Sequence, residues 1–147
     1  FVLLQDPTRR QELLEKVIHP IDRKGAMGVI NGWGLTDESQ REMYLDGIPR
    51  QFSMLRNAAC LILPCYHQPG PLLKPKDLSA LNSFASIWCC IENILVAAAA
   101  EGIFGVTRIP FEEERKVIHQ YLNLPSEYEI PCYLALGYPA KSSRRAK

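Results

Sequence analysis

A long apolar segment in the second half of the chain constrains the fold more than any other feature of the sequence. Between Cys89 and Ala100 the polar side chains are confined to the adjacent pair Glu92 and Asn93. A helix that is apolar on more than one face has to be buried on more than one side. We therefore expect a helix that runs through the core or serves both a core and a subunit interface. Its apolar positions fall in two stripes, Leu81, Phe84, Trp88, Ile91, Leu95 and Ala98, and Ile87, Cys90, Ile94 and Ala97.

The residues after this helix predict a short strand and then a second helix. Gly102 is typical of a helix C-terminus, and the stretch 103–109 is apolar enough to be extended. Pro110 suits the first turn of the next helix, and the acidic run 112–114 favours its positive end. The inner face of this helix is predicted to hold Val117, Ile118, Tyr121 and Leu122.

Elsewhere apolar strands alternate with helices. We expect strands over 1–5, 58–63 and 130–136, with a helix that starts at Asp6 and Pro7 and ends before Pro20. A further helix start lies at 36–39, with a cap at Asp77 or Ser79 for the long apolar helix. This alternation predicts an α+β fold with the sheet in the middle of the molecule.

One region gives no clear periodicity. Residues 21–35 contain four glycines and Trp33, which predicts a long flexible connection or surface lobe. These glycines do not follow a strand in the dinucleotide-binding pattern, so a phosphate loop is not predicted. The segment up to Arg56 is expected to be helical in part and broken around Gly47 and Pro49.

Size and charge narrow the classes of function. A chain of 147 residues is enough for a single domain, and a formal net charge of +1 gives no reason to expect nucleic acid as a partner. No signal peptide is evident, and the longest wholly apolar run, 94–100, is short for a membrane span, so we expect a cytoplasmic protein. Because the chain opens on a strand-like FVLL, residues are expected upstream of Phe1.

The five cysteines are an odd number and do not form a closed disulfide set. They are Cys60, Cys65, Cys89, Cys90 and Cys132, and most sit in apolar runs, which indicates reduced core residues in a reducing compartment. A zinc site built from Cys60, Cys65 and His67 is the alternative. These residues lack the close paired spacing of structural zinc sites, and the sequence offers no fourth ligand.

Three stretches carry a pattern beyond composition: ENILVAAAAEGIFG from Glu92, IPFEEERKVIHQYLNLP from Ile109, and IPCYLALGYPA from Ile130. In this order they resemble the carboxy-terminal half of the nitroreductase family. The opening FVLLQDPTRRQELLEKV also resembles the second segment of that family. The resemblance implies a three-layer α+β homodimer that binds FMN at the dimer interface. It also implies hydride transfer from NADH or NADPH to nitroaromatic, quinone or related acceptors.

The resemblance also implies site residues. The segment placed against the flavin ring would be Thr107, Arg108, Ile109 and Pro110, with the Ile109 N–H as the candidate donor to flavin N5. Many members carry glycine where this chain has Pro110, and proline cannot supply a second N–H there. The basic tail fits the position where the family holds the FMN phosphate, through Lys141, Arg144 and Arg145; a disordered basic end is the alternative.

One departure from the family is large. The Arg-rich opening helix that grips the flavin phosphate is absent and would lie upstream of Phe1. The 147 residues are therefore interpreted as one nitroreductase-like domain without its N-terminal helices. A non-catalytic or flavin-free relative that only dimerises is the alternative, and a flavoenzyme for ring or halide chemistry is a third.

Several single residues allow two interpretations. Glu92 is a polar anchor near the cofactor or, as we expect, pairs with a base at a less buried edge, and Asn93 bridges the partner chain or is satisfied in the core. His119 is expected to be solvated. Trp88 is expected in the core or interface, whereas Trp33 either covers a bound ring by stacking or is an ordinary surface residue.

Overall fold

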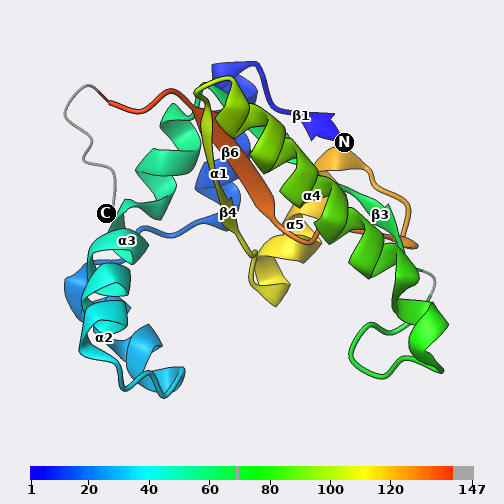
Figure 1. Cartoon of the computed structure of the whole chain (residues 1–147), viewed down its shortest axis with the longest axis horizontal. Helices are drawn as coiled ribbons and strands as arrows, with labels where there is room; N and C mark the ends of the chain where they lie inside the picture. The colour runs from blue at the N-terminus through cyan, green and yellow to red at the C-terminus, as the bar shows by residue number, and fades with distance from the viewer. Residues whose placement is uncertain (69, 141–147) are drawn as a thin grey trace.

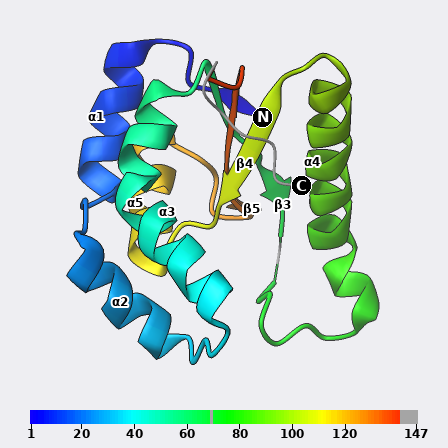
Figure 2. The same ribbon diagram turned by 60° about the vertical axis from the view of Figure 1, so that its left-hand side comes forward.

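The computed structural model describes residues 1–68 and 70–140. A central four-stranded sheet separates two layers of helices (Figure 2). The elements follow one another as β1 (Val2–Leu3), α1 (Pro7–Val17), α2 (Arg23–Gly32), α3 (Glu38–Asn57), β2 (Cys60–Leu63), β3 (Tyr66–His67), the 3-10 turn η1 (Leu78–Leu81), α4 (Asn82–Ala100), β4 (Phe104–Arg108), α5 (Glu112–Leu122), β5 (Tyr128–Glu129) and β6 (Tyr133–Gly137) (Figure 1).

The sheet is antiparallel throughout, in the order β1-β2-β6-β4. Strands β3 and β5 form a separate two-stranded ribbon. The α+β architecture expected from the sequence is confirmed. Strand β1 is shorter than the five-residue strand predicted from FVLLQ, because only Val2 and Leu3 pair with β2.

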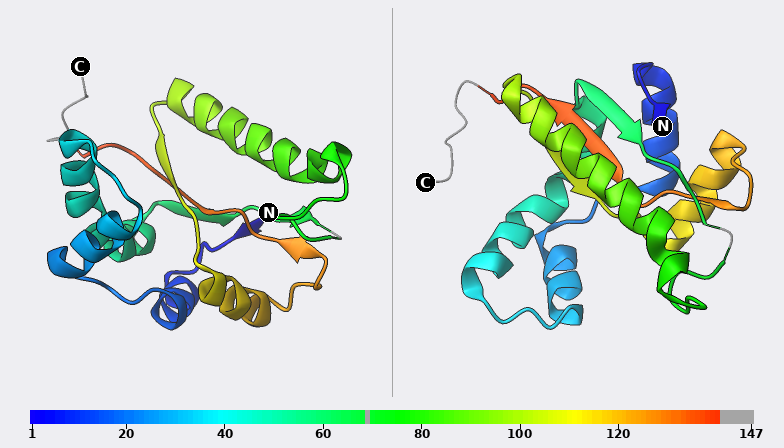
Figure 3. Two further views of the ribbon diagram at one scale, coloured as in Figure 1. Left: turned by 90° about the horizontal axis from the view of Figure 1, so that it is seen from below. Right: turned by 45° about the vertical axis from the view of Figure 1, so that its right-hand side comes forward.

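Alternation along the central strands divides the core into two layers. Leu61 and Tyr133 face one side of the sheet and pack against α1, α3 and α5. Their neighbours Ile62 and Leu134 face the other side and pack against α4. Figure 3 shows α4 alone on one side of the sheet, with α1 and α5 on the other. This two-sided burial explains why β2 and β6 are nearly continuous apolar runs.

Helix α4 buries only one stripe. Ile87 and Ile91 are buried against the sheet, while Val96 keeps 60% of its surface exposed. With η1, the stretch 78–100 is long and apolar enough to cross a membrane by length and composition, with 11% of the tested window buried. The expectation from sequence that no segment is long enough for a membrane span is therefore wrong by this criterion. The criterion is weak, because the mostly buried core helix of a soluble protein also meets it. The predicted C-terminal end is confirmed, since Gly102 has a φ of 71°. The predicted cap is wrong for α4, because Asp77 caps the 3-10 turn η1 and α4 begins after Leu81 without a side-chain cap.

The glycine-rich segment is a helix, which corrects the prediction of a flexible connection over 21–35. The Asp22 carboxylate caps α2 by accepting the Gly25 N–H at 2.8 Å. Ala26 and Ile30, one turn apart, are completely buried against α3. Tertiary packing therefore overrides the low helix propensity of the glycines.

Helix α3 also differs from its prediction, since it continues through Gly47 and Pro49 without ending. Leu45 and Ile48 join Ala26 and Ile30 in a small apolar cluster, separate from the two core layers. We call α2 and the part of α3 that packs against it, residues 23–48, the α2–α3 lobe. Figure 1 shows this lobe at one end of the molecule, away from α4.

Candidate functional site

A cavity of about 810 Å³ lies between the α2–α3 lobe and the end of β4. Its volume falls in the range of small-molecule sites. One wall comes from β4 and the start of α5, and the other from α3 and the C-terminal end of α1. Aromatic side chains from both walls line it: Trp33, Tyr44, Phe52 and Phe111.

Four residues assigned from the family resemblance meet in this cavity. Thr107, Arg108, Ile109 and Pro110 all line it. Ile109 is 67% exposed, whereas Pro110 is buried. The other three predicted cofactor residues, Lys141, Arg144 and Arg145, lie outside the described residues.

The register of the sheet tells which backbone groups of β4 are paired. The Leu4 N–H donates to the Leu61 carbonyl at 2.9 Å, which fixes the alternation of hydrogen bonds across β1, β2 and β6. Carried to β4, the alternation turns Arg108 toward β6 and Thr107 toward the opposite edge. Ile109 follows the last paired residue, and continuing the alternation by one position places its N–H on the same side as that of Thr107. Within the described residues no strand pairs with that edge. The N–H groups of Thr107 and Ile109 therefore point to where a ligand could accept them.

The turn after β4 is built differently from the prediction. Pro110 does not occupy the first turn of α5, because Phe111 is the N-cap and the helix begins at Glu112. The Glu114 carboxylate accepts the Phe111 N–H at 3.1 Å and so closes the helix start. The predicted acidic first turn, Glu112 to Glu114, is confirmed.

The Arg108 side chain is engaged inside the protein. Its Nη1 and Nη2 donate to the two oxygens of Glu114 at 2.6 and 2.7 Å. Its Nε donates to the Gln51 side-chain oxygen at 2.8 Å. The guanidinium carbon lies 5.8 Å from the Phe111 ring centroid and 5.4 Å from that of Tyr133. Since both charged partners are more than 90% buried, the Arg108 side chain is not available to a ligand.

The opposite wall was not identified from the sequence, apart from Trp33. Tyr44, Ile48 and Phe52 line the cavity at four-residue intervals along α3. This spacing is typical of a helix, but Gly47 and Pro49 predicted a break between these residues, so the shared face was not identified. The Trp33 and Tyr44 rings meet edge to face, with centroids 5.3 Å apart, and Trp33 stays 51% exposed. Trp33 is thus available for stacking, as one of its two interpretations requires.

Two titratable groups lie on β6 or next to it. Complete burial raises the pKa of the Cys132 thiol to about 12. Burial, with the nearby Glu114 carboxylate, also raises the pKa of Tyr133, whose hydroxyl has no hydrogen-bond partner among the described residues. Both groups are therefore neutral near pH 7 and add no charge to this part of the sheet.

The other single residues lie away from the cavity. Glu92 and Asn93 are exposed on α4, and Glu92 forms no ion pair within the described residues, so its expected pairing with a base is wrong. Trp88 packs in the layer between α4 and the sheet, as expected. Within ranges 1–68 and 70–140 no cluster of metal-ligating side chains is found. Of the cysteines, Cys132 is buried but Cys89 is exposed, which corrects the prediction of core positions for the latter.

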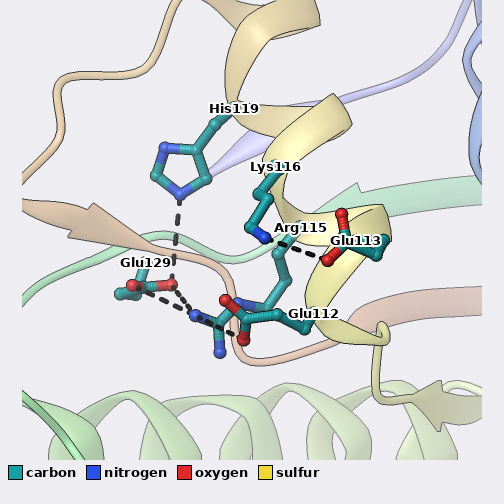
Figure 4. A network of polar contacts seen from close by, with 6 residues as sticks. All are labelled: Glu112, Glu113, Arg115, Lys116, His119 and Glu129. Carbon is teal, nitrogen blue, oxygen red and sulfur yellow. Dashed lines mark hydrogen bonds and ion pairs between the residues drawn. The ribbon is translucent and has the colours of Figure 1, made fainter.

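A polar network on α5 involves His119 (Figure 4). Its Nε2 lies 4.0 Å from the Glu129 carboxylate, and its side chain is 21% exposed, so the prediction of a solvated histidine is wrong. Arg115 approaches the same carboxylate at 3.4 Å. The network ties α5 to β5, and none of its members except Glu113 lines the cavity. We assign it a structural role.

Comparison with known proteins gives a consistent result for the fold. No family model matches the sequence, and no curated protein sequence matches it. Among solved structures, iodotyrosine deiodinase bound to FMN and 3-iodo-L-tyrosine aligns over 99% of this chain and 69% of its own, with a TM-score of 0.66 and 15% identity. A nitroreductase family protein from Clostridium difficile 630 aligns over 95% and 59%, with a TM-score of 0.56 and 16% identity.

NADPH:FMN oxidoreductase from Vibrio harveyi, complexed with NAD⁺, aligns over 95% of this chain with a TM-score of 0.57 and 17% identity. The chain covers only 50% of that protein's length. At these identities the likeness concerns the fold. It confirms the resemblance found in the sequence: this chain has the fold of nitroreductase family proteins.

Proposed function

We propose that the protein is an FMN-dependent oxidoreductase that uses NADH or NADPH to reduce nitroaromatic, quinone or related acceptors. One observation carries the proposal. The segment from Thr107 to Pro110, identified from sequence resemblance, lines a cavity of about 810 Å³ beside a strand edge that no other strand pairs with among residues 1–68 and 70–140. The fold shared with flavin-binding structures supports the same assignment.

The residues present fit the ring end of FMN. A flat heterocycle needs N–H donors along one edge and apolar faces, and the cavity offers the Thr107 and Ile109 amides beside Trp33 and Phe111. Lys16 also lines the cavity and provides a positive charge. Phosphate binding is assigned to Lys141, Arg144 and Arg145, which lie outside the described residues.

Under this proposal the bound flavin supplies the redox chemistry, while the protein provides position and electrostatics. The Ile109 N–H would donate a hydrogen bond to the ring and so orient it. Ile48 and Phe52 exclude water from the inner part of the cavity. Trp33 lines the cavity and keeps half of its surface exposed to solvent, so it would stack on a flat acceptor.

We propose a homodimer that uses the outer face of α4. The helix leaves Val96 60% exposed and carries further apolar side chains outside its buried stripe. A second copy of the chain packed on this face would bury it, as expected for a helix that is apolar beyond its core stripe. A cytoplasmic location stays a prediction.

Titration of the purified protein with FMN tests the assignment. We expect bound-flavin absorption bands, quenched flavin fluorescence, and oxidation of NADH or NADPH when a nitroaromatic or quinone is added. A protein that takes up no FMN, with an intact fold by circular dichroism, would contradict the proposal and favour the non-catalytic dimeric relative.

A second candidate, reductive dehalogenation, is favoured by the alignment with the FMN-bound deiodinase over 99% of this chain. The two activities are separated by the acceptor. Iodide release from an iodophenol under reducing conditions, without turnover of nitroaromatics, would select dehalogenation.

A further inference from the structure

Arg108 connects the two walls of the cavity. It belongs to β4, its Nη atoms bond to Glu114 of α5, and its Nε bonds to Gln51 of α3. One side chain thus contacts Glu114, 6 positions away in the sequence, and Gln51, 57 positions away. Arg108, Gln51 and Glu114 all line the cavity.

This arrangement also fixes the turn between the walls. Glu114 Oε2 accepts both from Arg108 and from the Phe111 N–H. The backbone from Ile109 to Phe111 is therefore held at both ends by one carboxylate–guanidinium pair. A planar guanidinium bonded in a bidentate manner has little freedom to rotate, and burial strengthens its hydrogen bonds.

We infer that Arg108 is a positioning residue that sets the direction of the Ile109 N–H, and that it is not itself a ligand to the flavin or to a phosphate. The inference rests on the proposed function. The engaged donors are those that a phosphate-binding arginine would need, and the pair is more than 90% buried. Gln51 extends the effect to α3, so the turn and the opposite wall keep a fixed separation.

Two variants and one control test the inference in the full chain. Arg108→Lys keeps the charge but cannot form the fork with Glu114 together with the bond to Gln51. Gln51→Leu leaves the ion pair intact and removes only the link to α3. Asp46→Asn removes an exposed ion pair with Arg50 on the same helix and is the matched control.

The first measurement needs no cofactor. In Arg108→Lys we expect amide hydrogen exchange at Phe111 to rise about tenfold, because its acceptor Glu114 is no longer held. Gln51→Leu should give a smaller rise, and Asp46→Asn none. Circular dichroism and thermal unfolding confirm that each variant is folded. Unchanged exchange at Phe111 in folded Arg108→Lys would overturn the inference.

The second measurement is the FMN dissociation constant, with the flavin absorption spectrum. We expect about tenfold weaker binding and a shifted spectrum in Arg108→Lys, and a change of about threefold in Gln51→Leu. Faster exchange with unaltered FMN affinity would overturn the positioning role, since the turn would then not matter for binding. A wild-type protein without FMN affinity would instead overturn the proposed function.

Discussion

Gly105 of β4 lies directly against the Leu95 side chain of α4. A Cβ at Gly105 would come within 2.4 Å of Leu95 Cδ2 and 2.6 Å of Leu136 Cδ2. The absence of a side chain at this position is what lets α4 approach the edge strand of the sheet.

We predict that Gly105→Ala destabilises the protein by about 1–3 kcal/mol, because two leucine side chains have to move in a packed layer. Urea unfolding measures the effect. Gly28→Ala is the control: it meets no atom within 4 Å and lies in a helix, so about 0.5–1 kcal/mol of stabilisation is expected. Equal effects at the two sites would contradict the close packing of β4 on α4.

The buried ion pair gives a second prediction. Glu114→Gln should cost about 3–5 kcal/mol of unfolding free energy, because it leaves the Arg108 charge buried without a partner. Glu113→Gln, the neighbouring residue with an 82% exposed side chain, should leave stability unchanged within error. Thermal or chemical unfolding of both variants provides the comparison, and a Glu114→Gln protein as stable as the wild type would argue against the pair.

A third prediction concerns Trp33. Trp33→Ala should raise KM for a flat aromatic acceptor by about 5–30-fold, because it removes a stacking face worth roughly 1–2 kcal/mol. Trp33→Phe should restore most of the affinity. Tyr138→Ala, at a more exposed aromatic residue that does not line this cavity, is the control. An unchanged KM in Trp33→Ala would leave Trp33 as an ordinary surface residue.

The Cys132 thiol predicts a loss of stability in alkaline solution. Its pKa rises from the ordinary 9.0 to about 12 on folding, so above pH 9 the unfolded chain loses the proton first. The contribution of the protonated thiol to the unfolding free energy is therefore fully present below pH 9. It is lost as the pH rises toward 12, by ~1.4 kcal/mol per pH unit. The raised pKa of Tyr133 acts in the same direction at higher pH.

Urea unfolding at pH 8 and pH 10.5 checks this prediction. The difference in unfolding free energy between wild type and Cys132→Ala should shift by about 2 kcal/mol in favour of the variant at the higher pH. Cys89→Ala, at an exposed position on α4, should follow the wild-type pH dependence. Parallel curves for wild type and Cys132→Ala would show that the thiol does not contribute.

Self-association through α4 gives the fifth prediction. Val96→Glu should convert a dimer to a monomer in analytical ultracentrifugation, because it places a charge in the apolar face. Met43→Glu, at a similarly exposed apolar site on α3, should leave the dimer intact. A wild-type monomer at micromolar concentration would contradict the dimer, and detergent-dependent solubility would instead favour a membrane-associated α4.

The sequence was informative where local pattern and burial agree. The order of α4, β4 and α5 was predictable because apolar spacing, Gly102 and the acidic residues 112–114 indicate the same succession of elements, although α5 begins at Glu112 and not at Pro110. The existence of strands β2 and β6 was predictable because both of their faces are buried. Their starts were predicted too early, since β2 begins at Cys60 instead of residue 58 and β6 begins at Tyr133 instead of residue 130.

The α2–α3 lobe was not predictable because its stability comes from contacts distant in sequence. Gly25 and Gly28 lower helix propensity, yet Ala26 and Ile30 are buried against α3. The link between Arg108 and Gln51 spans 57 positions and leaves no local signal. Thus the β4 side of the candidate site could be found from sequence resemblance, whereas the opposite wall needed the tertiary structure.

The separate apolar cluster of the α2–α3 lobe affects how this protein could diversify. Ala26, Ile30, Leu45 and Ile48 form their own packing unit, so substitutions there add to changes in the main core with little coupling. Mutations in the lobe can therefore change the shape of the cavity beside β4, and with it the small molecules that bind there. The sheet and the helices packed on it would be inherited unchanged.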